Sequence, residues 1–232
     1  MTPKRLVLLV EGDGDVAAAP ILLKRLLAEH NAFDVVFLDP RPLRVGEYGK
    51  ISKHAFREWR RFLGAAAKRK DLGACLLLLD GDGRALVEGQ PFCAMRAARR
   101  LAHEAQKVGG GTLFSVAIVF ACVEFESWLI AGATSLQGKR FADGRLELPA
   151  KIEPPDLRNL EASPRDAKGW FHRIMNTGYK PARDQAELTR LVDLNVVRQQ
   201  GMRSFRPLES AIRQLVEAVR LGAPTVNPSA QG

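Results

Sequence analysis

The sequence has few cysteines and no recognisable cysteine or histidine metal pattern. Cys75, Cys93 and Cys122 are isolated and odd in number, and two of them lie inside apolar runs. Disulfide-rich secreted domains and structural zinc sites use paired cysteines at short spacing, so neither class is expected. The four histidines also lack paired metal spacing. Buried cysteines in a reducing compartment are predicted, and we expect a cytoplasmic protein.

Long hydrophobic runs are missing as well. The longest apolar stretches, such as Leu6–Val10 and Val116–Val123, have the length of strands. A membrane-spanning helix needs about 20 apolar residues, and the N-terminus carries no secretory hydrophobic segment. No membrane partner is therefore expected. With 46% hydrophobic and 26% charged residues, the chain has the composition of a globular protein, folding alone or as a homo-oligomer.

Acidic residues are outnumbered by basic ones. The 35 Lys and Arg residues against 26 Asp and Glu residues leave a net charge of +9, which favours polyanionic partners such as nucleic acid, although Arg-rich usage alone can also produce it. One segment is strongly basic: Lys50, Lys53, Arg57, Arg60, Arg61, Lys68, Arg69 and Lys70. It is either a solvated helix face or a nucleic-acid-binding surface. Trp59 and Phe62 within it either stack on bases or form its buried side.

Apolar runs alternate with amphipathic segments along the first half of the chain. Strands are predicted at 6–10, 33–38, 74–79 and 113–122, and helices at 16–29, 52–69, 91–108, 166–175, 182–195 and 208–221. This alternation predicts an α/β fold with a mostly parallel sheet flanked by helices. We expect a domain over residues 1–135, a helical C-terminal region over 136–222 and a flexible tail over 223–232.

Carboxylates follow the predicted strands where each one ends. Glu11 comes after the first run, Asp80 and Asp82 after the third, and Glu124 after the fourth. Sites in parallel sheets lie outside the carboxyl ends of strands, so these acids should converge. Mg²⁺ prefers such oxygen ligands. Asp15, which can also cap the helix at 16–29, would bind either directly or through water.

Each acidic turn also has a simpler interpretation, because Asp-Gly sequences are common in tight turns. A calcium loop starting at Asp80 is not expected, since its twelfth position holds Pro91 rather than Glu. The occurrence of both motifs after strand-like runs, in this order, favours a carboxylate site.

At these residues the chain resembles the Toprim superfamily, found in topoisomerases, primases and the nuclease component of overcoming-lysogenization-defect proteins. Val10–Asp15 is similar to the family's Glu-Gly motif, and Leu79–Asp82 to its Asp-x-Asp motif. The segment Phe125–Leu129 resembles the Phe-Glu-x-Trp-Leu of a group of uncharacterised prokaryotic Toprim-like proteins. Lys168, Tyr179–Pro181 and Ser204–Phe205 resemble segments of the helical part of that group.

The resemblance implies roles for individual residues. Glu11 would be a metal ligand or general base, Asp80 and Asp82 metal ligands, and Glu126 a ligand of a second metal, with Glu124 as the alternative. Lys168 or Lys180 would neutralise charge developing on a phosphate. Asp15 stands where nuclease-like members often have Glu. The cofactor implied is Mg²⁺ or Mn²⁺.

The expected function is a metal-dependent nuclease acting on phosphodiester bonds, with DNA favoured over RNA. The resemblance also implies a place in phage or mobile-element defence beside a partner ATPase. One alternative is a non-catalytic module that binds nucleotide or nucleic acid. Another is phosphate transfer on a small nucleotide, for which the sequence offers no base-recognition motif.

Overall fold

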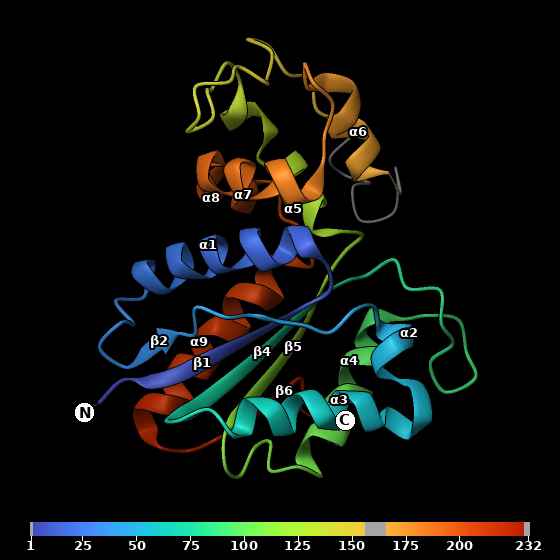
Figure 1. Cartoon of the computed structure of the whole chain (residues 1–232), viewed down its shortest axis with the longest axis vertical. Coiled ribbons are helices and arrows are strands. Elements are labelled where there is room, and N and C mark those ends of the chain that lie inside the picture. Colours follow the sequence, from blue (N-terminus) through green and yellow to red (C-terminus); the bar gives the residue numbers. More distant parts are fainter. Residues whose placement is uncertain (1, 156–165, 230–232) are drawn as a thin grey trace.

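The computed structural model describes residues 2–155 and 166–229, which form an α/β fold around one parallel sheet (Figure 1). The strand order is β2-β1-β4-β5-β6, and the short β3 also pairs with β1. All of these pairs are parallel, so the predicted fold class is confirmed. The strands are β1 (Lys4–Val10), β2 (Val36–Leu38), β3 (Leu43–Arg44), β4 (Leu72–Asp80), β5 (Ser115–Ala121) and β6 (Val226–Asn227).

Helices cover both faces of this sheet, which explains why its central strands are apolar throughout. Leu6, Leu8 and Val10 of β1 belong to the core beneath α1 (Asp13–Glu29) and α9 (Phe205–Leu221), whereas Val7 and Leu9 belong to the core beneath α3 (Lys53–Ala67) and α4 (Ala94–Gln106). The helices are α1 (Asp13–Glu29), α2 (Tyr48–Ile51), α3 (Lys53–Ala67), α4 (Ala94–Gln106), α5 (Phe125–Ala131), α6 (Ala167–Ile174), α7 (Pro181–Leu191), α8 (Leu194–Gln199) and α9 (Phe205–Leu221).

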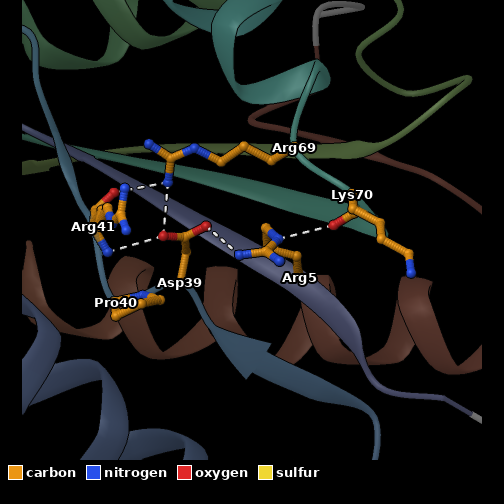
Figure 2. A pocket seen from close by; sticks show the side chains of 6 residues that line it. All are labelled: Arg5, Asp39, Pro40, Arg41, Arg69 and Lys70. Carbon is orange, nitrogen blue, oxygen red and sulfur yellow. Dashed lines mark hydrogen bonds and ion pairs between the residues drawn. The ribbon is translucent and has the colours of Figure 1, made fainter.

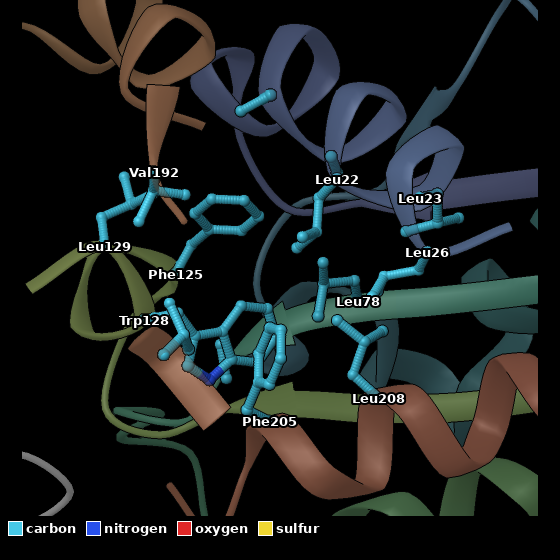
Figure 3. Packing of buried hydrophobic residues seen from close by; sticks show 14 of the residues in the cluster. Leu22, Leu23, Leu26, Leu78, Phe125, Trp128, Leu129, Val192, Phe205 and Leu208 are labelled. Carbon is cyan, nitrogen blue, oxygen red and sulfur yellow. The ribbon is translucent and has the colours of Figure 1, made fainter. Parts of the chain in front are cut away.

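The last helix belongs to the sheet rather than to a separate C-terminal layer. Helix α9 contacts β5, β4 and α1, and its Leu208 and Phe205 meet Trp128 of α5 and Leu22 of α1 in one core (Figure 3). The expected division at residue 135 therefore cuts through a continuous hydrophobic core. Helices α5 to α8 lie on the side of α1 that faces away from the sheet (Figure 1).

Several sequence predictions differ from the structure in detail. The basic segment divides into α2 and α3 with a kink, where His54, Ala55 and Phe56 have positive φ, and the helix predicted at 182–195 ends at Leu191 before α8. The expectation of a flexible tail is wrong for Val226 and Asn227, which pair with β5; residues 230–232 lie outside the described residues. In the described ranges, none of the helices combines the length and apolar character needed to span a bilayer.

The basic segment turns one apolar side toward the core. Trp59 is fully buried, and its Nε1 donates to Leu101 O at 2.9 Å. Trp59 is therefore a core residue, and it is not available to stack on bases. Lys53, Arg57 and Arg61 are exposed on the other side of α3.

A small pocket beside β2 contains an ion-pair network (Figure 2). The buried carboxylate of Asp39 accepts from Arg5 at 2.7 Å and lies 2.8 Å from Arg69. Arg5 also donates to Lys70 O at 2.8 Å. The network joins the end of β2 to β1 and to the connection between α3 and β4.

Candidate functional site

Glu11 and Asp80 meet at the carboxyl edge because β1 and β4 are neighbours in parallel register, with Val10 opposite Leu78. The Glu11 carboxylate accepts a hydrogen bond from Asp80 N at 3.0 Å. Asp80 Oδ1 in turn accepts from Phe125 N at 2.9 Å, at the start of α5. The ends of β1, β4 and β5 are thus joined through two carboxylates.

Gly81 allows β4 to turn against the end of β5. Its N–H donates to Ala121 O at 2.7 Å and Val123 O at 2.8 Å. A Cβ at this position would lie 2.8 Å from Cys122 Sγ and 2.9 Å from Ala121 O. A larger residue would therefore push Asp80 away from the edge.

Lys168, at the start of α6, projects into a group of three carboxylates. Its Nζ lies 3.3 Å from Asp80 Oδ2, 3.3 Å from Glu124 Oε2 and 3.8 Å from Glu126 Oε2. Glu126 is only 1% exposed, whereas the Lys168 side chain is 43% exposed. Because Asp80, Glu124 and Glu126 all surround Lys168, we call these four residues the Lys168 cluster.

Tyr179 completes the cluster from the connection before α7. Its hydroxyl donates to Glu126 Oε1 at 2.8 Å. The second oxygen of Glu126, Oε2, is buried and accepts no hydrogen bond from the described residues, and the same holds for Glu124 Oε2. Both oxygens face the Lys168 ammonium, at 3.8 Å for Glu126 and 3.3 Å for Glu124, so a metal ion would have to compete with Lys168 for them.

Asp15 has a different position from the one expected. Helix α1 begins at Asp13 with Gly12 as its N-cap, so Asp15 is not the cap. Its Oδ2 accepts from Gly12 N at 2.9 Å and its Oδ1 from Gln185 Nε2 at 2.8 Å. Both oxygens of Asp15 are thus engaged, one within α1 and one across to α7.

Gly14 permits this close approach of α7 to α1. A Cβ on Gly14 would lie 2.0 Å from Gln185 Oε1 and 2.9 Å from Pro181 Cβ. The absence of a side chain at Gly14 lets Gln185 reach Asp15.

Two predicted site residues stay outside these contacts. Asp82 is exposed, although its charge influences the pKa of both Glu11 and Glu124. Lys180 is exposed too, and its backbone N–H donates to Asp184 at the start of α7. The structure joins Lys168, rather than Lys180, to the acids.

The acids of this edge have raised pKa values, chiefly because of burial. Burial raises the pKa of Glu11 to about 7, opposed by the hydrogen bond from Asp80 N and helped by the charge of Asp15. Burial likewise raises the pKa values of Asp80, Glu124 and Glu126, while Lys168 opposes each rise. The same carboxylates outweigh the effect of burial on Lys168 and raise its pKa, so the ammonium stays charged.

The carboxylate oxygens of this site have the chemistry that a hard divalent cation prefers, but they are not arranged around a metal position. Converging carboxylate oxygens, two of them buried beside the Lys168 ammonium, are ligands that Mg²⁺ and Mn²⁺ prefer. Within the described ranges, no group of three or more His, Cys, Asp or Glu side chains is already arranged to hold a metal ion. Lys168 lies between these acids, so a metal ion would have to take over its contact with Asp80.

Sequence reasoning missed two residues of this region as site residues. Tyr179 appeared only as part of a resembling segment, and Gln185 did not appear at all. Gln185 lies in α7 and Tyr179 in the connection just before it, and the packing of α7 on α1 has little local signature in the sequence. The glycine at position 14, unusual inside the first turn of a helix, was the one local signal.

Comparison with known proteins gives a family but no function. No curated protein matches the sequence. Residues 10–213 match the family described as "Domain of unknown function (DUF4276)". This match includes Glu11, the Lys168 cluster, Tyr179 and most of α9. Because it covers well over half of the sequence, the chain belongs to the DUF4276 family.

Proposed function

We propose that the protein is a Toprim-like, metal-dependent nuclease that hydrolyses phosphodiester bonds in nucleic acid at the carboxyl edge of its sheet. The observation that carries the proposal is the convergence of Glu11, Asp80, Glu124 and Glu126 from three strand ends. Ionised acids gathered at one edge repel one another; two unit charges about 4 Å apart do so by roughly 4 kcal/mol at an effective dielectric constant near 20. A cation is their natural counter-ion.

Asp80, with Glu124 or Glu126, would hold the metal ion, and Glu11 either shares it or takes the proton from the attacking water. A divalent cation bound there would activate a water and stabilise the charge on the phosphate. Tyr179 positions Glu126 by donating to one of its oxygens, leaving the other for a ligand. Lys168, once displaced from Asp80, is close enough to bind a phosphate oxygen.

The net charge of +9 supports nucleic acid as the partner. A partner ATPase, a role in phage or mobile-element defence and a cytoplasmic location form the remainder of the proposal, and they rest on the Toprim resemblance and the cysteine usage.

Asp80→Asn tests the proposal because the amide retains an oxygen that can accept from Phe125 N. With plasmid or single-stranded DNA and Mn²⁺ or Mg²⁺, we expect cleavage to fall by more than about 100-fold while DNA binding is retained. Asp34→Asn is the matched control, since Asp34 is exposed and distant from the site in sequence. Wild-type protein that cleaves neither DNA nor RNA with either metal would refute the nuclease proposal.

The second candidate is a non-catalytic module that binds nucleotide or nucleic acid. Lys168 favours it, because an ammonium already balances three of the acids without any metal. In that case Asp80→Asn would leave binding unchanged and wild-type protein would show no cleavage. Calorimetry with Mn²⁺ in the presence of an oligonucleotide then separates a metal-dependent module from a metal-independent one.

A further inference from the structure

A groove of about 690 Å³ lies between α4 and α9, at the edge of β5. Its volume falls in the range of small-molecule sites, roughly 300–1,000 Å³. Strand β6 pairs only with Val116 and Ala117, so among the described strands the later part of β5 has a neighbour only on its β4 side. The side chains of Ile118 and Phe120 contribute to the lining there.

The groove adjoins the acidic site. Its lining includes Cys122, two residues before Glu124, and Ser204, which donates to Cys122 O at 3.4 Å. On the β4 side of the same segment, Gly81 N donates to Ala121 O and Val123 O. The backbone of residues 121–124 therefore separates the groove from Asp80.

The charge of the lining favours an anionic ligand. Arg203 and Arg206 line the groove and are both exposed, and no acid is found among the described residues of the lining. Over residues 2–155 and 166–229, neither arginine has an ion-pair partner. By contrast, two arginines of the pocket in Figure 2 are already paired with Asp39.

The remaining lining combines apolar and amide-bearing side chains. Met95 is 58% exposed although it borders the groove, and Pro207 faces it from α9. Gln214 and Asn227 offer amide groups. Apolar contact together with amide donors and acceptors suits a nucleobase, while the arginines suit its phosphates.

We infer that this groove binds an unpaired nucleotide next to the bond that is cut, and so makes the protein prefer single-stranded nucleic acid. The inference rests on the proposed nuclease function for its substrate. Arg203 and Arg206 hold backbone phosphates, and the base lies against Met95 and Pro207. A paired, stacked base of a duplex cannot enter without first leaving its helix, which costs free energy.

Fluorescence anisotropy in the presence of EDTA tests this preference for single strands. It compares the affinity for a labelled 12-nucleotide DNA strand with the affinity for the blunt duplex of the same sequence. We expect the strand to bind more tightly than the duplex. Arg203→Ala and Arg206→Ala should each weaken strand binding by about tenfold and lower the salt slope by about one. Arg213→Ala is the control, because Arg213 is exposed on the same helix outside the groove. Ser210→Trp should fill the groove and weaken strand binding, provided that its thermal melt matches wild type.

Two results would overturn the inference: equal affinity for strand and duplex, or arginine variants that bind the strand as tightly as R213A. If the arginine variants bind the strand as tightly as R213A, the groove would instead suit an extended peptide that pairs with β5. Failure of the nuclease proposal gives a different pattern, in which groove-dependent strand binding persists but Mn²⁺ supports no cleavage. If every groove variant cleaves nucleic acid as wild type does, the groove does not bind the substrate, and the nuclease proposal still stands.

Discussion

One ammonium group, that of Lys168, balances three carboxylates in this structure. Asp80, Glu124 and Glu126 come from β4 and from the start of α5, whereas Lys168 comes from a helix more than 40 residues later in the sequence. Among the described residues, the charge balance of these three carboxylates in the absence of metal therefore depends strongly on Lys168.

Lys168→Met should lower the free energy of unfolding by about 1–3 kcal/mol, less than for a fully buried ion pair because Lys168 is partly exposed. The loss should be larger at pH 8 than at pH 6, since the pKa of Glu126 is raised to about 7 and this carboxyl takes up a proton at the lower pH. Added Mn²⁺ should raise the melting temperature of this variant more than that of wild type. Lys151→Met, at an exposed pair with Glu153, is the control. Equal Mn²⁺ responses would contradict a shared cation position.

The raised pKa of Glu11 predicts a pH-dependent metal affinity. Protons compete with the metal ion for this carboxylate, so affinity rises as pH increases through about 7. Calorimetry should give Mn²⁺ binding about tenfold weaker at pH 6 than at pH 8. Glu11→Gln should flatten this dependence. A wild-type affinity that is the same at both pH values would exclude Glu11 as a ligand.

Much of the site could be predicted at this scale, because apolar runs locate strand ends and parallel strands bring their ends together. Glu11 and Asp80 meet for this reason. The sequence left Glu124 and Glu126 as alternative ligands of a second metal; Glu124 caps α5 and Glu126 lies within it, and both contact Lys168. The positions of Tyr179 and Gln185 depend on helix packing and have no short-range pattern.

At the scale of elements, the pairing of α1 with α7 joins the helical region to the first strand end. The contact brings Gln185 to Asp15 and depends on the missing side chain at Gly14. Neither helix has a sequence that specifies this partner.

Gly14→Ala should destabilise the protein by about 1–3 kcal/mol, because the added methyl group overlaps Gln185 and Pro181. Gly64→Ala is the matched control: Gly64 lies inside α3, and a methyl group added there would meet no described atom within 4 Å. That change should stabilise α3 by about 0.5–1 kcal/mol. Chemical denaturation of both variants measures the difference, and a neutral Gly14→Ala would show that α7 can move away at no cost.

At the scale of the whole molecule, the sheet takes helices from both ends of the sequence. The amphipathic pattern of residues 208–221 correctly predicted a helix. It did not predict which face of the sheet this helix covers. Leu208, Ile212 and Leu215 of α9 are buried in the core that also contains β4 and α1. The domain boundary expected at residue 135 was based on a change in composition, and composition does not indicate which distant segments pack together.

A fragment of residues 1–135 should therefore lack a cooperative thermal transition, because it leaves one face of the sheet without α9. Circular dichroism melts of the fragment and the full chain would measure this. A fragment with a sharp transition near that of the full chain would show that α9 contributes little to folding.

The position of α9 also has a consequence for synthesis. At rates of about 5–20 residues per second, the ribosome makes strands β1 to β5 seconds before α9, the helix that packs on them. The leucines of that face remain in contact with water, or with a chaperone, until residue 221 has emerged from the exit tunnel. The native packing of this sheet face therefore forms only after α9 has been made, and a pause before α9 would prolong the exposure of the apolar residues that it covers.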